Sequence, residues 1–237
     1  MTIPRRLEPE LLDHLPADDP LAVGARRDLK RVNAWMRNAS CIASLLRARA
    51  GARQPRTILD LGSGDGALML EVARHLAPHW RDVTAILLDQ QNIVSDATRE
   101  GFAALHWRAE SVSADVFDFL ERAPSGGIDA ITANLFLHHL TDQQLARLFA
   151  KAAELAWLVV ACEPRRAKFV IEMSRKLWAI GCNKVTVHDA IASARAGFVG
   201  QELSALWPRQ GGWELQERPA FVFNHMFAAR QTAATGG

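Results

Sequence analysis

A glycine-rich loop carries the first chemistry in this sequence. The stretch TILDLGSGDGALML, residues 57–70, places Gly62, Gly64 and Gly66 between an apolar run and a helical pattern. In such a strand-to-helix turn, glycines let the backbone approach a ligand while the helix N-terminus faces it. With Ala67 as a further small residue, the loop fits both the dinucleotide fingerprint and a site for a smaller adenosine compound. The loop alone leaves both ligand classes open.

Acidic residues around this loop separate the two ligands. Asp89 closes the next apolar run, VTAILLD, and its carboxylate could accept both ribose hydroxyls of either ligand. Asp60 and Asp65 lie where a dinucleotide pyrophosphate would add negative charge, whereas an ammonium group would be attracted to them. The chain also contains no tyrosine, which excludes the tyrosine base of short-chain dehydrogenases. These observations favour S-adenosylmethionine.

Three histidines are candidate general bases for an acidic hydroxyl, because an imidazole with a pKa near ~6.5 can accept its proton. His138 and His139 follow the apolar run IDAITANLFL, at the edge where open parallel sheets bind ligands. Adjacent side chains point apart, so only one should face the site. The alternative is that a histidine caps the turn before Thr141.

The third candidate, His188, shares a predicted helical face with Arg195. This pair could bind an acidic hydroxyl and remove its proton. In the alternative interpretation, Thr186 and Asp189 cap the helix, and His188 and Arg195 belong to a solvated polar stripe.

The composition limits the kind of protein that positions these residues. The chain has 237 residues, 49% hydrophobic and 23% charged, which indicates one globular domain. A formal net charge of +2 gives no field that would attract nucleic acid, and no apolar run approaches the ~18 residues of a membrane span. Three widely spaced cysteines without a CxxC pair argue against disulfides and a zinc site. We expect a cytoplasmic protein with a small-molecule partner, no nucleic acid and no metal.

Periodicity predicts the elements that carry these residues. Apolar positions at helical spacing from Leu29 to Leu46 predict one long amphipathic helix. Five apolar runs, TILDLG, VTAILLD, AALHWRAES, IDAITANLFL and LAWLVVACE, then alternate with helical patterns, which is typical of a parallel sheet covered on both faces. Thr141 and Gln144 form a capping box for one helix. The runs GWELQERPA and FVFNHMFAAR should pair antiparallel across a short connection containing proline.

Together these motifs resemble the class I S-adenosylmethionine-dependent methyltransferases. ILDLGSGDG is similar to their first motif, LLDQQ to the ribose-binding acid, SADVFDF to the adenine segment and IDAITANLFLHHL to the fourth strand. The resemblance covers roughly residues 56–230. Within this family, the chain most resembles the small-molecule, ubiquinone-methyltransferase-like type. It implies a Rossmann-like α/β fold with a mostly parallel seven-stranded sheet, a C-terminal antiparallel hairpin and N-terminal helices. Residues 1–55 would form a helical lid and residues 56–237 the cofactor-binding domain.

The resemblance also implies roles for individual residues. Beside Asp60 and Asp65, the cofactor set comprises Gly62, Ser63 and Gly64 for the methionine part, Asp89 and Gln90 for the ribose, Asp115 and Val116 for the adenine, and Asn134 and Leu135 beneath the methyl group. With Arg195, the predicted acceptor contacts are Met36, Arg37 and Phe136, although core packing is the commoner use of such apolar residues.

The predicted reaction is methyl transfer to an oxygen, or less readily a carbon, of a small aromatic, quinol or polyketide-like metabolite, which suits secondary metabolism. S-adenosylhomocysteine would be the product. Such a reaction needs a positioned acceptor whose proton is removed. ANLFLHHL lacks the two prolines of enzymes that methylate nucleobases or amides, which disfavours those acceptors. The alternatives are a non-catalytic binding or scaffold protein of this fold and a nicotinamide-dependent oxidoreductase, and a homodimer stays open.

Overall fold

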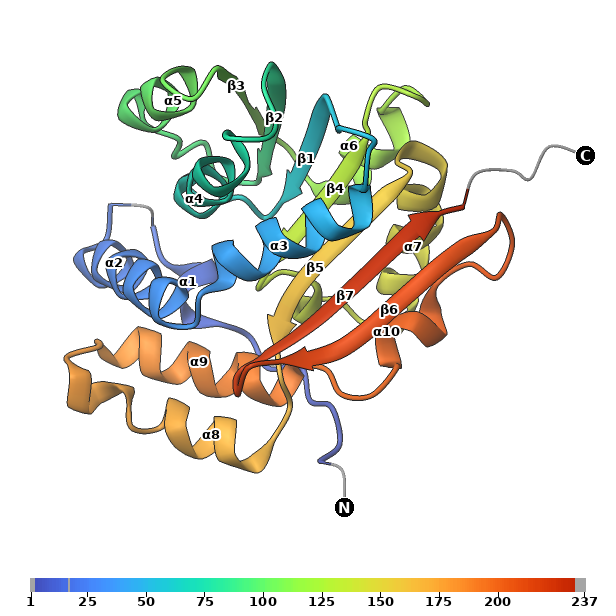
Figure 1. Ribbon diagram of the computed structural model, residues 1–237. Coiled ribbons are helices and arrows are strands. Elements are labelled where there is room, and N and C mark those ends of the chain that lie inside the picture. The colour runs from blue at the N-terminus through green and yellow to red at the C-terminus, as the bar shows by residue number, and fades with distance from the viewer. Residues whose placement is uncertain (1–2, 17, 233–237) are drawn as a thin grey trace, which may run out of the picture.

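A computed structural model, which describes residues 3–16 and 18–232, contains one mixed sheet with helices on both faces (Figure 1). In the described chain the strand order is β3-β2-β1-β4-β5-β7-β6. The strands are β1 (Thr57–Leu61), β2 (Val83–Asp89), β3 (Trp107–Ser113), β4 (Ala130–Asn134), β5 (Leu158–Pro164), β6 (Trp213–Ala220) and β7 (Asn224–Gln231). β1 to β5 are parallel, and β7 runs antiparallel to both β5 and β6. The predicted seven-stranded sheet with its C-terminal hairpin is confirmed.

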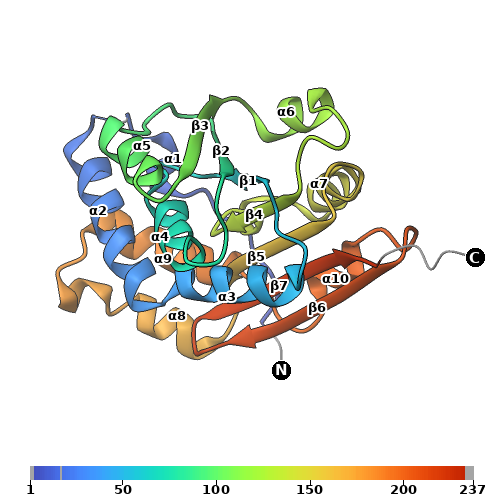
Figure 2. The same ribbon diagram turned by 45° about the horizontal axis from the view of Figure 1, so that its top comes forward.

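The helices divide between the two faces of the sheet. They are α1 (Leu11–His14), α2 (Pro20–Trp35), α3 (Asn38–Ala50), α4 (Ala67–Leu76), α5 (Asp96–Ala103), α6 (Val116–Arg122), α7 (Asp142–Leu155), α8 (Lys168–Ser174), α9 (Lys184–Ala196) and α10 (Glu202–Leu206), with 3-10 turns η1 (Leu137–His139) and η2 (Leu177–Ile180). α3, α4 and α5 cover one face and α6, α7 and α10 the other (Figure 2). The consecutive β1 residues Ile58 and Leu59 enter the two cores on opposite faces of the sheet, which explains the continuous apolar run. The capping box of Thr141 and Gln144 is present at α7.

The predicted single N-terminal helix is wrong, because the chain breaks between α2 and α3. Arg37 adopts the left-handed conformation, with φ 58°, which ends α2 and redirects the chain. The break is held from a distant strand, since Asn224 Nδ2 donates to Met36 O at 3.2 Å and to Asn38 Oδ1 at 2.9 Å. As a result, α3 packs into the core on one face of the sheet, whereas α2 contributes no residue to that core.

Residues 3–14, which precede α2, form a segment that we call the N-terminal strap. Arg5, largely buried, donates to Ala196 O and Leu140 O, both at 2.8 Å. At the end of the strap, Leu11 N donates to Asp189 Oδ1 at 2.7 Å. The strap is therefore fastened to both η1 and α9. In the part of the chain that the structure describes, no helix is long and apolar enough to cross a membrane.

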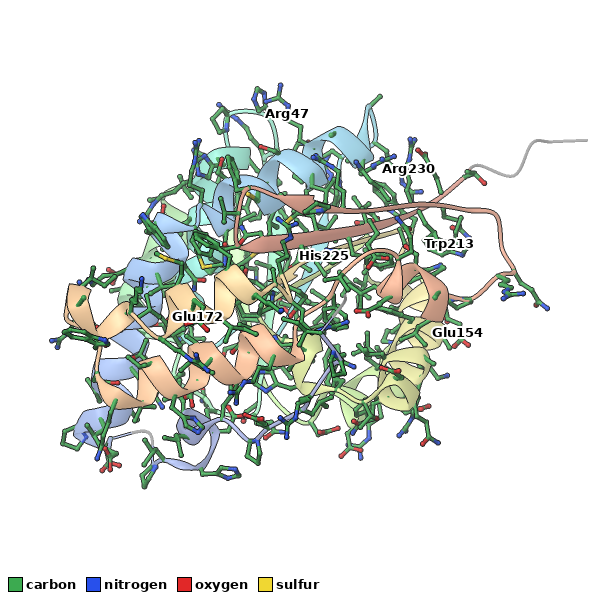
Figure 3. All side chains as sticks on the ribbon, turned by 90° about the horizontal axis from the view of Figure 1, so that it is seen from below. Arg47, Glu154, Glu172, Trp213, His225 and Arg230 are labelled. Carbon is green, nitrogen blue, oxygen red and sulfur yellow. The ribbon has the colours of Figure 1, made fainter. Side chains whose placement is uncertain are left out.

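The C-terminal hairpin also carries a buried hydrogen bond between side chains. His225 of β7, labelled in Figure 3, lies 2.8 Å from Glu217 of β6. Glu217 accepts the amides of Leu203 and Ser204, so it fastens α10 to the hairpin. Pro219 lies inside β6 and not in the connection as predicted, which is tolerated because β6 is an edge strand.

Candidate active site

A cavity of about 1040 Å³ lies at the carboxyl ends of β1, β2 and β4. Figure 1 shows α1, α2, α8 and α9 grouped beyond these strand ends. The cavity is lined by the glycine loop, the ends of the three strands, α2, α8, η2 and α9. This is the position at which open parallel sheets bind ligands.

The three glycines of the loop serve two different purposes. All have positive φ, at 66° for Gly62, 55° for Gly64 and 74° for Gly66. A Cβ on Gly62 would lie 2.5 Å from the Phe136 ring, and one on Gly66 2.8 Å from Leu87, so these two are required by packing. A Cβ on Gly64 would meet nothing within 4 Å. Gly64 therefore presents open backbone to the cavity, as the prediction requires.

The predicted cofactor acids have different surroundings. Asp60 lies buried on β1, where burial raises the pKa of its carboxyl to about 7; a 2.7 Å hydrogen bond from Thr132 opposes this shift and the Asp89 charge adds to it. Asp65 is instead paired with Lys30, whose Nζ lies 2.5 Å from Oδ2. Of these two acids, Asp60 lines the cavity without an ion pair to a cation among the described residues.

Asp89 holds the loop in place. Its Oδ2 accepts the Gly64 amide and its Oδ1 the Gln91 amide, both at 2.9 Å, while the side chain lines the cavity. Ser63 and Asn134 also line the cavity, and their Oγ and Oδ1 atoms are buried with no hydrogen-bond partner among the described residues. Unpaired buried polar atoms are rare, so both are available to a ligand. Leu135 lies beside them with a positive φ of 51°, a strained conformation often found at functional sites.

The predicted adenine contacts lie away from this wall. Gln90 Nε2 donates to Asp115 Oδ2 at 3.4 Å, and Asp115 caps α6 through the Phe117 amide. Val116 is buried in the core. Gln91 and not Gln90 lines the cavity. The ribose assignment of Gln90 and the adenine assignments of Asp115 and Val116 therefore stay predictions without a place on the cavity wall.

His138 is held between two carboxylates. Its Nδ1 lies 2.8 Å from Glu163 Oε2 and its Nε2 3.2 Å from Glu10 Oε1. Burial lowers the pKa of this imidazole, but the two carboxylates outweigh that effect and raise it to about 9. Glu163 also accepts the amides of Phe136 and Leu137. With both nitrogens occupied and a proton held at neutral pH, His138 has the environment of a structural cation and not of the predicted base.

The other predicted bases occupy different positions. His139 is partly exposed, and its nitrogens lie 3.9 Å from Glu10 and 3.6 Å from Asp13, beyond hydrogen-bond distance. It lines a smaller cavity of about 330 Å³ that shares Glu10, Asp13 and His138 with the main one. His188 is exposed, bound to Asp189 and outside both cavities.

The predicted acceptor residues also divide. Met36 and Arg37 line the cavity, whereas Phe136 packs behind Gly62. Arg195 pairs with Glu8 of the N-terminal strap at 2.9 Å, which removes it from the site. Sequence reasoning placed His188 and Arg195 on one helix correctly, but the side chains they meet come from segments it could not place.

Glu10 and Glu163 are the functional-site residues that sequence reasoning missed. Glu163 ends the apolar run LAWLVVACE, and a charged residue closing a buried strand was the available signal. Glu10 gave no signal, because it reaches His138 only through the path of the N-terminal strap.

A parallel sheet with a reversed β7 and a glycine loop facing an open cleft defines the Rossmann-like methyltransferase fold. Residues 58–156 match the methyltransferase domain family. An uncharacterised methyltransferase of Mycobacterium tuberculosis is 33% identical over 90 residues, 38% of this chain and 40% of that protein.

Solved structures agree in fold. An O-methyltransferase family protein from Burkholderia thailandensis aligns with a TM-score of 0.63 at 17% identity, over 92% of this chain and 62% of that one. The plantazolicin methyltransferase BpumL, in complex with S-adenosylhomocysteine, aligns with a TM-score of 0.60 at 15% identity, over 91% and 92%. The family match and the relative identify a methyltransferase domain in residues 58–156, and the solved structures share the fold over most of the described chain. This chain spans less than two thirds of the mycobacterial and Burkholderia proteins.

Proposed function

We propose that this protein transfers a methyl group from S-adenosylmethionine to the hydroxyl of a small aromatic acceptor of phenol or quinol type. The observation that carries this proposal is the pair of buried oxygens Ser63 Oγ and Asn134 Oδ1, which have no hydrogen-bond partner among the described residues and belong to residues that line the cavity together with Gly64. Asp60 would balance the ammonium of the cofactor, and Asp89 would hold its ribose. When bound, the cofactor supplies the electrophilic methyl group.

The acceptor would occupy the part of the cavity between the strand ends and α2. Because methyl transfer is a displacement that depends on alignment, the main task of the protein is to position the hydroxyl and exclude water. Among the predicted bases, we favour His139, since its nitrogens are not engaged at hydrogen-bond distance by the neighbouring carboxylates. It lines the smaller cavity that shares Glu10, Asp13 and His138 with the main one, so an acceptor would have to reach it past these shared residues. His138, with Glu163, would fix the turn that carries it.

A screen of phenols and quinols with methyl-labelled cofactor tests this function. We expect label transfer to a phenolic oxygen by the wild-type protein. Gly64→Val should abolish both transfer and S-adenosylhomocysteine binding, because the side chain would enter the cleft. Gly126→Val is the matched control: Gly126 also has a positive φ, at 79°, and free space at Cβ, but lies in the loop before β4. Equal loss in both variants would contradict the assignment of the cleft.

His139→Ala tests the proposed base. We expect turnover to fall by roughly 10²–10⁴-fold, the usual contribution of a general base, with cofactor affinity nearly unchanged. His188→Ala is the control, because that exposed side chain lines neither the main cavity nor the smaller one that His139 lines. Full activity of His139→Ala would show that the acceptor loses its proton by another route.

A further inference from the structure

One face of α2 is buried near its start and turns apolar side chains to the cavity further along. The buried residues of α2 are Ala22, Ala25 and Asp28, and Asp28 accepts the Asn183 amide at the start of α9. The larger side chains Leu29, Val32 and Met36 continue the face of Ala22 and Ala25, are only partly buried and line the cavity. At 1.5 Å per residue, this stripe extends for about 10 Å along the helix.

A second apolar wall lies across the cavity. Val170 and Met173 of α8 and Leu177 of η2 all line it. We call the space bounded by these residues and by Leu29, Val32 and Met36 the apolar arm. In the view of Figure 1, α9 lies between α2 and α8. Val170 and Leu177 are only 5% and 8% exposed, whereas Met173 and the three α2-side residues are partly buried. Partly exposed apolar side chains gain free energy when a ligand removes them from water.

The apolar arm has a polar end and an open end. Ser63 and Asn134 stand at the polar end, where the strands finish. Trp35 and Ile180 line the same cavity, yet they are 58% and 55% exposed, so the cavity opens to solvent there. The Phe223 ring, 4.8 Å from that of Trp35, extends the apolar surface at this mouth. The cavity is therefore amphipathic along its length.

We propose that the apolar arm binds an unbranched hydrocarbon chain carried by the acceptor, whose hydroxyl-bearing ring lies at the strand ends. This inference rests on the proposed function, since it assigns the arm to the acceptor of that reaction. A stripe one side chain wide along α2 suits an extended chain. Met36 and Met173, one on each wall, have flexible side chains that adapt to such a ligand. The open mouth lets the end of a longer chain leave the protein.

A series of 4-alkylphenols, from methyl to nonyl, tests the proposal by calorimetry with S-adenosylhomocysteine present. Each methylene buried in the arm should lower the Kd about fourfold, which corresponds to ~0.8 kcal/mol. The gain should stop once the chain passes Trp35 and Ile180. A Kd that does not change with chain length would overturn the proposal. Calorimetry measures binding alone, and the label-transfer screen measures methylation separately. If phenols are methylated but their Kd does not depend on chain length, the apolar arm is refuted and the proposed function is not.

Two valines on α2 provide matched variants. Val32→Trp should fill the arm and weaken binding of the nonyl compound at least tenfold, with little effect on the methyl compound. Val23→Trp is the control, because Val23 is 44% exposed on the same helix and does not line the cavity. Binding of S-adenosylhomocysteine by both variants verifies that they fold. If Val32→Trp keeps the full dependence on chain length, the chain binds elsewhere and the proposal is wrong.

Discussion

Two buried titratable residues at the strand ends have pKa values shifted upward for opposite reasons. Asp60 has no cation beside it, so burial favours its neutral form at pH 7. His138 is enclosed by Glu10 and Glu163, so its charged form persists despite burial. A cationic ligand would therefore stabilise the ionised form of Asp60. The charge of His138 is already stabilised by carboxylates of the protein.

Asp60 should make cofactor binding depend on pH. Because its pKa is about 7 and an ammonium group favours the ionised carboxylate, affinity for S-adenosylhomocysteine should rise by up to ~10-fold per pH unit below pH 7 and level off above it. Calorimetric titrations between pH 5.5 and 8 measure this. Asp60→Asn should bind weakly and without this slope. An unchanged slope in that variant would assign the effect to another group.

His138 should contribute to stability most strongly at and below neutral pH. Its folded pKa, about 9, exceeds the ordinary value of 6.5, so its contribution is complete below pH 6.5 and is lost as the pH rises through 9. Denaturant unfolding of wild type and His138→Ala should therefore show a large stability difference at pH 6 that narrows toward pH 10. A difference that widens with pH would mean that His138 is neutral in the folded protein.

At the scale of elements, the sequence predicts local patterns well but does not predict contacts between residues that are far apart in the chain. Apolar runs predict the position of each described strand. Burial on both faces explains the continuous apolar runs of β1, β4 and β5, but not that of the edge strand β6, which is largely unburied. The break between α2 and α3 depends on Asn224, and the charge of His138 depends on Glu10. Neither partner is near in sequence, so periodicity around residue 36 or residue 138 could not reveal them.

The N-terminal strap provides a test at this scale. Arg5→Ala should leave the carbonyls of Ala196 and Leu140 without their donor and destabilise the protein by about 1–3 kcal/mol. Amide exchange in residues 3–14 should accelerate as the strap loosens. Arg6→Ala, at the neighbouring exposed position, is the control and should change neither. Equal exchange rates in both variants would show that Arg5 does not fasten the strap.

For the whole molecule, the sequence motifs lead to the correct fold and to the loop face of the cleft. They do not lead to its opposite face, where α2, the N-terminal strap and α9 meet, because three separate segments build that wall. This division explains why Gly64, Asp60 and Asn134 line the cavity as predicted, whereas His188 and Arg195 do not. The α2 face of the cavity depends on tertiary structure, and the face formed by the glycine loop depends on a local motif.

Calorimetric titration of the purified protein with S-adenosylhomocysteine and, separately, with NAD tests the central claim most directly. We predict binding of S-adenosylhomocysteine with a Kd of about 1 μM, near −8 kcal/mol, and no binding of NAD. Binding of NAD without S-adenosylhomocysteine would contradict the assignment of the cleft and indicate a nicotinamide-dependent oxidoreductase. Binding of neither would indicate a scaffold of this fold that has lost its cofactor.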